Sequence, residues 1–249
     1  MKISLITVSY NSEETIEETI QSVLAQKNID LEYILIDGAS SDTTLKIIEP
    51  YKSKIAVFLS EKDNGIYDAM NKGIQLATGD VIGILNSDDV FTNDEILGKV
   101  CKAFEDPDVD AIYGDLEYVD RIDLSKVKRK WISGKYKEGA FLKGWMPPHP
   151  TFYVRKKIYD EFSSFNLDFN SAADYEIMLR FIHKHKIRLN YLPEIMIKMR
   201  QGGQSNASLI NRLKANREDK KAWMVNGLKP APFTLIRKPL SKLGQFLKK

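Results

Sequence analysis

Two adjacent carboxylates mark the point of the sequence where residue types and spacing most clearly suggest chemistry. The segment Asn86-Ser87-Asp88-Asp89 follows residues 81–85, an apolar run with the length of a buried strand. In open α/β sheets, ligands bind at the carboxyl ends of the strands. Adjacent acids repel each other unless a cation joins them, and oxygen ligands suit Mg²⁺ or Mn²⁺. We therefore predict a divalent metal that carries a diphosphate here. Helix capping is the simpler alternative, but it needs only one acid, and Asp94 is better placed for it.

A polar helix face precedes these acids in the chain. The spacing predicts a helix over residues 67–77 that ends near Gly79, a residue suited to the left-handed position after a helix. Lys72 can meet a phosphate as a point charge. A solvated helix face has the same pattern, but its place just before the acidic segment favours a binding site. The polar stripe consists of Asn64, Asp68, Asn71 and Lys72.

Two further predicted strands end in polar residues. The first ends in Val8-Ser9-Tyr10-Asn11, where backbone donors and a ring can hold a nucleotide base. The alternative is that Asn11 caps a helix, with Glu14 completing a capping box. The second strand ends at Asp37, whose carboxylate can accept a hydrogen bond from a pyrimidine N–H or form an Asx-turn. A G-x-G-x-x-G motif, the dinucleotide fingerprint, does not occur.

The second half of the chain supplies two more candidate groups. Asp174 precedes a predicted helix over residues 175–183, so it is either a general base at a helix start or an N-cap. His149 lies in Pro147-Pro148-His149-Pro150, where it either faces a ligand or is structural. His183 and His185 have no carboxylate at a ligand spacing, so no zinc site is predicted.

The elements that must position these residues alternate between strand and helix up to about residue 90. Strands that are apolar throughout predict a parallel α/β sheet covered by helices on both faces. The second half, from about Asp106, is less regular, with short strands, clustered aromatic residues and a second helix over residues 209–225. We predict one domain over residues 1–227, divided into a nucleotide half (1–105) and an acceptor half (106–227), and a tail over 228–249.

Composition limits the classes of protein to consider. The 249 residues include one cysteine, so an internal disulfide is excluded and a reducing cytosol is indicated. Cys101 falls in an apolar helical pattern, which indicates a core position. Neither a stretch of 18 apolar residues nor a signal peptide is found.

The charge is unevenly distributed. The net charge is +3, but residues 228–249 hold six basic residues and no acid, which leaves 3 − 6 = −3 for residues 1–227. A basic excess confined to the tail argues against nucleic-acid binding. Pro239 can start a helix there, with Leu240, Leu243 and Leu247 on one side, which predicts a basic amphipathic segment on an anionic membrane surface. A solubilising tail, or a helix packed on the domain, is the alternative.

Taken together, the motifs resemble those of glycosyltransferase family 2, the inverting nucleotide-sugar transferases with the GT-A fold. The resemblance covers about residues 1–205. It is closest to bacterial transferases that build colanic acid, O-antigen and similar surface polysaccharides. The segments that carry it are Val8-Ser9-Tyr10-Asn11, residues 36–43, residues 63–72, Asn86-Ser87-Asp88-Asp89, residues 173–176 and Arg200-Gln201-Gly202-Gly203-Gln204-Ser205.

The resemblance implies a role for each matched position. Tyr10 and Asp37 would contact the base, usually uracil, and Asp88 would bind the metal as the second acid of a D-x-D motif. Asp174 would be the catalytic base. His149, Gly202 and Gly203 would border the acceptor. Two departures stand out: Gly38 follows Asp37 where many members have a second acid, and Asn86 replaces the first acid of D-x-D. The donor-binding candidates are Val8, Tyr10, Asn11, Asp37, Asn64, Asp68, Asn71, Lys72, Asn86 and Ser87.

The resemblance also implies ligands and partners. These are a UDP-sugar donor, Mn²⁺ or Mg²⁺, and a polyprenyl diphosphate-linked oligosaccharide acceptor at the inner face of the cell membrane. A sugar nucleotidyltransferase is the alternative enzyme, but it needs a glycine-rich basic loop after the first strand, which is absent. A non-catalytic sugar-nucleotide-binding scaffold is the other alternative, and it has no need of both Asp88 and Asp174.

Overall fold

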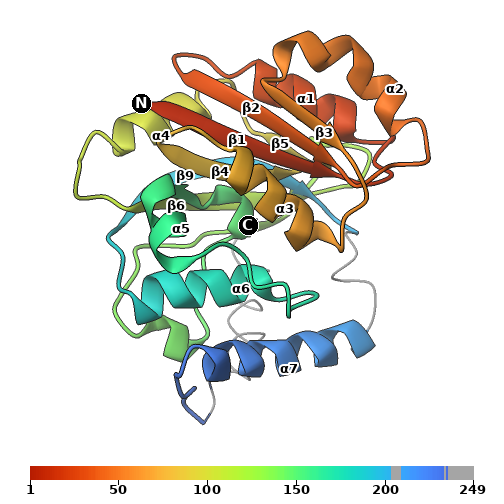
Figure 1. The fold of residues 1–249 in the computed structure, drawn as a ribbon. Helices are drawn as coiled ribbons and strands as arrows, with labels where there is room; N and C mark the ends of the chain where they lie inside the picture. Colours follow the sequence, from red (N-terminus) through yellow and green to blue (C-terminus); the bar gives the residue numbers. More distant parts are fainter. Residues whose placement is uncertain (203–208, 233, 235–249) are drawn as a thin grey trace.

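The computed structural model describes residues 1–202, 209–232 and 234, and within them nine strands form one sheet (Figure 1). The strand order is β3-β2-β1-β4-β8-β6-β9-β5, with β7 pairing on β6. The strands are β1 (Lys2–Ser9), β2 (Asp30–Asp37), β3 (Val57–Ser60), β4 (Val81–Asn86), β5 (Asp89–Phe91), β6 (Ala111–Val119), β7 (Val127–Trp131), β8 (Tyr153–Arg155) and β9 (Leu189–Arg200). The α-helices are α1 (Ile16–Leu24), α2 (Thr44–Ile48), α3 (Ile66–Leu76), α4 (Ile96–Ala103), α5 (Lys156–Phe162), α6 (Ala173–Met178) and α7 (Leu209–Val225).

The first half of the chain forms the parallel part of the sheet, as predicted. β1 pairs in parallel with β2 and β4, and β2 pairs in parallel with β3. The register places Ser9 opposite Asp37 and Val8 opposite Asn86, so these strands end at one edge. The candidate residues of three separate motifs therefore meet at that edge, which we call the ligand edge.

The second half extends the sheet with mixed directions. β8 pairs antiparallel with both β4 and β6, and β9 runs parallel to β6. β5, which begins at Asp89, the last residue of the acidic segment, pairs antiparallel with β9 through Asp89 and Met199. The acidic segment is thereby held between strands from the two halves of the chain.

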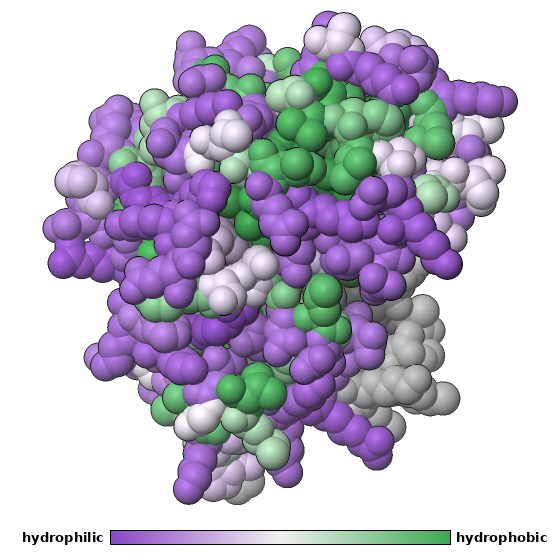
Figure 2. Space-filling view, in the orientation of Figure 1, coloured by the Kyte–Doolittle hydropathy of each residue, from purple (hydrophilic) through white to green (hydrophobic). Residues whose placement is uncertain are grey.

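Alternating side chains divide the core into two layers. Ile6 and Val8 of β1 face the layer that contains α3 and α6, whereas Ile3 and Leu5 face the layer that contains α1 and α4. Figure 1 shows α3 across one face of the sheet and α7 packed beneath α6. Figure 2 shows an apolar area on this side of the molecule, over the part of the sheet beside α3.

Local expectations at three residues need comment. Asn11 does not cap α1, because the helix begins at Ile16 and Asn11 has a φ of 47°. Gly79 is not in the left-handed region; a Cβ there would lie 2.6 Å from the Ser4 hydroxyl oxygen, so glycine allows close packing. Cys101 is half-buried in α4, and burial raises the pKa of its thiol, so it is an inert side chain.

The carboxyl-terminal helices follow the predicted ranges closely. The helix after Asp174 changes character at Leu179, where α6 continues as a π-helical segment, Leu179–Lys184. α7 covers residues 209–225 as predicted. In the part of the chain that the structure describes, no helix has the length and apolar character needed to cross a membrane.

Most of the basic tail lies outside the described residues, including Pro239, Leu240, Leu243 and Leu247. The described start of the tail contacts the domain. Leu228 packs against the core, and the Thr234 hydroxyl donates a hydrogen bond to the Leu142 carbonyl oxygen at 2.7 Å.

Candidate active site

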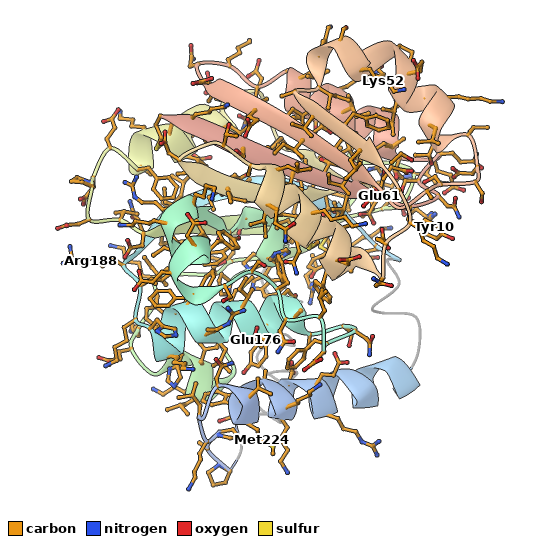
Figure 3. All side chains as sticks on the ribbon, viewed as in Figure 1. Tyr10, Lys52, Glu61, Glu176, Arg188 and Met224 are labelled. Atoms are coloured by element: carbon orange, nitrogen blue, oxygen red, sulfur yellow. The ribbon has the colours of Figure 1, made fainter. Side chains whose placement is uncertain are left out.

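The exposed ring of Tyr10 lies at the end of β1. It is 61% exposed, and Figure 3 shows it at the same edge of the molecule as Glu61, which follows β3. Gly38 at the end of β2 explains how these segments approach one another. A Cβ at this position would lie 2.4 Å from Asp63 Oδ2 and 3.4 Å from Tyr10 Cδ2. The carboxylate of Asp63 therefore fills space beside Tyr10, a role that its sequence position does not predict.

Asp37 is fully buried, and both of its carboxylate oxygens accept hydrogen bonds. Its donors are the Ser9 hydroxyl at 3.0 Å, the Ser40 amide at 2.9 Å and hydroxyl at 2.5 Å, and the Ser60 hydroxyl at 2.8 Å. Asp37 thus ties the ends of β1, β2 and β3 together. Its contact with a base stays a prediction.

Asn11 has a similar bridging place. Its side-chain oxygen accepts a hydrogen bond from the backbone N–H of Ser41 at 2.9 Å, and its backbone N–H donates to the Ser40 hydroxyl at 2.9 Å. The loops after β1 and β2 are therefore held together behind the exposed Tyr10 ring.

The predicted polar stripe of α3 divides into two parts. Asp68 accepts a hydrogen bond from the backbone N–H of Asn64 at 2.9 Å, and Lys72 pairs with Glu61 at 2.8 Å. The hydrogen bond to Glu61 raises the pKa of Lys72, which therefore stays charged. Asn71 differs, because it is buried and its amide bonds the backbone of Phe165.

Two buried side-chain oxygens of the acidic segment after β4 lack hydrogen-bond partners in the part of the chain that the structure describes. Asn86 Nδ2 donates to Asp89 Oδ2 at 3.3 Å, but Asn86 Oδ1 and Asp89 Oδ1 are buried without a partner among the described residues. Burial raises the pKa of both Asp88 and Asp89, and the charge of Asp88 raises that of Asp89 further. The Ser87 hydroxyl lies 2.8 Å from that of Ser12.

These residues fit a hard divalent cation. The donor set is made of oxygens, two of them buried without a partner in the described chain, and burial raises the pKa of both acids, which a bound cation would oppose. Asp88 is partly exposed, so it is the carboxylate that can reach a ligand. Across the described ranges, no group of three His, Cys, Asp or Glu side chains is arranged to hold a metal. Further ligands would therefore have to come from water or from the donor's phosphates.

Arg200 holds the acidic segment from the end of β9. It is 5% exposed, and its guanidinium donates to the Asp88 carbonyl oxygen at 2.7 Å and to the Arg121 carbonyl oxygen at 3.0 Å. It also pairs with Glu18 of α1. The sequence predicts no role for Arg200, because its only signal there is a charge at the end of an apolar strand. Gly202 follows with a φ of 106°, and Gly203 lies outside the described residues.

Asp174 is the second residue of α6, which begins at Ala173, so Ala172 occupies the N-cap position and the capping alternative for Asp174 is wrong. The carboxylate of Asp174 is partly exposed, and the Tyr67 hydroxyl donates to its Oδ1 at 3.4 Å. His149 is nearby, its ring against that of Phe165 with 5.7 Å between centroids. Burial lowers the pKa of His149, and the charge of Asp174 opposes this more weakly.

One phenol links the two acidic groups. Burial raises the pKa of Tyr118, Arg129 lowers it, and the charges of Asp89 and Asp174 both raise it. The two carboxylates therefore lie within electrostatic range of the same side chain, although they come from different halves of the chain.

The family model described as "Glycosyl transferase family 2" matches residues 4–165. The chain belongs to this family. An uncharacterized glycosyltransferase of Mycobacterium tuberculosis is 31% identical over 188 residues, which cover 72% of this chain and 68% of that protein. A PGL/p-HBAD biosynthesis glycosyltransferase of Mycobacterium bovis is 26% identical over 208 residues, covering 82% and 78%. The putative teichuronic acid biosynthesis glycosyltransferase TuaG of Bacillus subtilis is 36% identical over 97 residues, 38% of each chain.

Solved structures confirm the predicted fold class, a GT-A sheet flanked by helices. S. aureus TarS 1-349 in complex with UDP-GlcNAc superposes with a TM-score of 0.68 at 18% identity, and the match covers 91% of this chain. The chain described here spans 65% of the length of that TarS chain. The mannosyltransferase PcManGT of Pyrobaculum calidifontis, in complex with GDP-Man and Mn²⁺, gives 0.66 at 19% identity, covering 97% and 69%.

Proposed function

We propose that this family 2 glycosyltransferase transfers a sugar from a UDP-sugar to a hydroxyl of a lipid-linked oligosaccharide, with inversion at the anomeric carbon. The acceptor would be linked to polyprenyl diphosphate and would belong to surface-polysaccharide biosynthesis at the inner face of the cell membrane. The similarity to TuaG, a putative teichuronic acid biosynthesis glycosyltransferase, supports the pathway class, and the complex of TarS with UDP-GlcNAc supports the donor class.

One observation carries the proposal: the candidate site holds carboxylates in two different environments, the acid pair at the ligand edge and Asp174 on α6. Asp88 and Asp89 have raised pKa values and an oxygen without a partner, which suits a cation with a diphosphate. Asp174 keeps a partly exposed carboxylate that already accepts one hydrogen bond, which suits proton transfer. A protein that only binds a sugar nucleotide needs the first kind of group but not the second.

In the proposed reaction, the ring of Tyr10 and the loops tied by Asp37 and Asn11 hold the nucleoside. Asp88 would hold Mn²⁺ or Mg²⁺, which when bound stabilises negative charge on a diphosphate leaving group. Asp174 takes the proton of the acceptor hydroxyl while that oxygen forms a bond to the anomeric carbon. The bond from this carbon to the diphosphate oxygen breaks in the same displacement, and its electron pair leaves with the UDP. A single displacement inverts the anomeric centre.

The two halves of residues 1–227 would divide the work. Residues 1–105 would bind the donor, and residues 106–227 would bind the acceptor, with His149 and the segment at Gly202 and Gly203 beside it. The basic tail would hold the enzyme on an anionic membrane surface, close to its lipid-linked acceptor.

A donor panel tests the proposal directly. UDP-sugars and GDP-sugars are incubated with the protein and with Mn²⁺, Mg²⁺ or chelator, and the released nucleoside diphosphate is measured. We expect metal-dependent release from a UDP-sugar, and its loss in Asp174→Asn but not in Asp160→Asn, a matched change at an exposed acid of α5. Equal release by the wild type and Asp174→Asn would rule out the proposed base.

A further inference from the structure

Two side chains of α3 reach across to the acceptor half of the chain. Tyr67 and Asn71 are four residues apart, so they lie on one face of the helix, and each is 9% exposed. The Tyr67 hydroxyl donates to Asp174 Oδ1, and Asn71 contacts the loop that precedes Asp174. The helix that carries Asp68 in its first turn, directly after Asn64 and Gly65, therefore also touches the proposed base.

Asn71 uses its whole amide group on one residue. Its Nδ2 donates to the Phe165 carbonyl oxygen at 2.9 Å, and its Oδ1 accepts from the Phe165 amide at 2.9 Å. This pair of bonds replaces a backbone partner for Phe165 and pins the loop to α3. The sequence predicts Asn71 as a donor-binding residue, but in the structure its side chain is buried and both of its polar atoms bond the backbone of Phe165.

The ring of Phe165 completes the contact. It stacks on the ring of Tyr67 with 5.5 Å between centroids and 26° between planes, and it meets the ring of His149 edge-on. Phe165 thereby fixes the ring of Tyr67, which in turn aims the hydroxyl at Asp174. Burial raises the pKa of Tyr67, as does the charge of Asp174, so the phenol stays protonated and remains a hydrogen-bond donor.

The other side of the same loop is held by α7. Glu218 accepts hydrogen bonds from the amides of Asn170 at 3.0 Å and Ser171 at 2.8 Å, and Lys221 donates to the Asp168 carbonyl oxygen at 2.8 Å. The stretch from Phe165 to Asp174 is thus fixed at both of its faces. Of these contacts, the Tyr67 hydroxyl is the one that touches the carboxylate itself.

We propose that Tyr67 and Asn71 are positioning residues that orient the Asp174 carboxylate for proton transfer. Both contact Phe165: Asn71 bonds its backbone, and Tyr67 stacks on its ring. This inference rests on the proposed role of Asp174 as the base. Tyr67 occupies Oδ1, which leaves Oδ2 to face the acceptor hydroxyl. A misplacement of about 1 Å in such a group costs on the order of 100-fold in rate.

The test uses Tyr67→Phe, which keeps the ring stack and removes only the hydroxyl. We expect kcat to fall about 10- to 100-fold, while the KM for the donor, the affinity for UDP by calorimetry and the melting temperature stay at wild-type values. Tyr159→Phe is the matched control, because Tyr159 is a buried tyrosine of α5 that packs against Phe181. It should leave kcat unchanged.

A double variant separates this inference from the proposed function. In an Asp174→Asn background, Tyr67→Phe should cause no further loss, because the two groups act as one unit. A wild-type kcat in Tyr67→Phe, additive losses in the double variant, or a parallel loss of UDP affinity and melting temperature would each overturn the positioning role. If Asp174→Asn itself keeps the wild-type rate, it is the proposed function that fails.

Discussion

Two buried carboxylate clusters lie at opposite ends of the same parallel strands. At the amino end, Glu32 of β2 is 6% exposed and accepts hydrogen bonds from Lys2 at 2.8 Å, from the Ser4 hydroxyl at 2.5 Å, and from the amide and hydroxyl of Thr78 at 2.7 and 2.5 Å. At the carboxyl end, Asp89 is fully buried and has one oxygen without a described partner.

The pKa values of the two clusters move in opposite directions. Burial by itself would raise the pKa of Glu32, but its hydrogen bonds outweigh burial and lower the pKa to about 2. For Asp89, burial and the charge of Asp88 both raise the pKa, and Asn86 and Arg200 compensate only in part. Where the acid is structural, hydrogen-bond donors surround its carboxylate completely. Where a ligand is expected, the acid pair has too few donors and too little positive charge around it among the described residues, and a bound cation would supply that charge. Asp37 lies at the ligand edge but is saturated, so position alone does not make an acid available.

The largest effect should come from the carboxylate that is proposed to react. We expect Asp174→Asn to lower the transfer rate about 10²- to 10⁴-fold, because a positioned general base contributes that much. Melting temperature and UDP affinity should stay close to wild type, since Asp174 is not the cap of α6. A variant that instead loses stability and keeps its rate would reverse the assignment of Asp174 to chemistry.

The next effect concerns the acid pair. Asp88→Asn should weaken Mn²⁺-dependent UDP binding by about 100-fold or more, because removing a metal ligand should cost at least as much as losing an outer-shell partner of one. Asp89→Asn should do less harm, since Asp89 is fully buried while Asp88 is partly exposed. Calorimetric titration of UDP with and without Mn²⁺ measures both variants. Unchanged metal dependence in Asp88→Asn would remove the metal assignment.

The amino-end cluster should respond in stability instead of activity. Glu32→Gln should lower the free energy of unfolding at pH 7 by about 2–3 kcal/mol and leave UDP binding unchanged. Because the folded-state pKa of Glu32 lies below its ordinary value of 4.5, its contribution is present above that value and is lost as the pH falls toward about 2. Urea unfolding at pH 7 and at pH 2.5 should therefore show a difference between variant and wild type that shrinks at the lower pH.

The smallest effect on either cluster should follow removal of residues 235–249. Thr234 contacts the domain, so a truncation after it spares that contact, and folding and transfer to a soluble acceptor should be unchanged. Flotation with anionic liposomes should fall, because each basic residue near such a surface contributes about 1 kcal/mol. Equal flotation with and without the segment would end the membrane role of the tail.

The ligand edge could be predicted from the sequence because the strand ends follow from apolar runs of clear length. The parallel order of β1, β2 and β4 then brings Tyr10, Asp37 and Asp88 to one edge without further information. The state of each acid could not be predicted, since it depends on partners distant in sequence. Asp37 is saturated by Ser9, Ser40 and Ser60.

The same limit explains the side chains that were assigned differently or missed. Tyr67 has helical apolar spacing, and only its hydroxyl, 107 residues from Asp174 in sequence, reveals a second task. Asn71 has the spacing of a polar stripe, but the loop at Phe165 covers it. Helical periodicity shows which face of a helix is polar and carries no information on what lies opposite that face.

The place of β9 in the sheet also determines when, during synthesis of the chain, the acidic segment can reach its native contacts. β5 takes its partner strand from β9, and Arg200 reaches back 112 residues to the Asp88 carbonyl oxygen. At about 5–20 residues per second, a ribosome needs roughly 6–22 seconds to make that stretch. The parallel strands of the amino-terminal half can form in this interval, but the acidic segment still lacks its contacts with β9 and Arg200. Competence for the reaction therefore comes late in the synthesis of the chain, although the acids it depends on are made early.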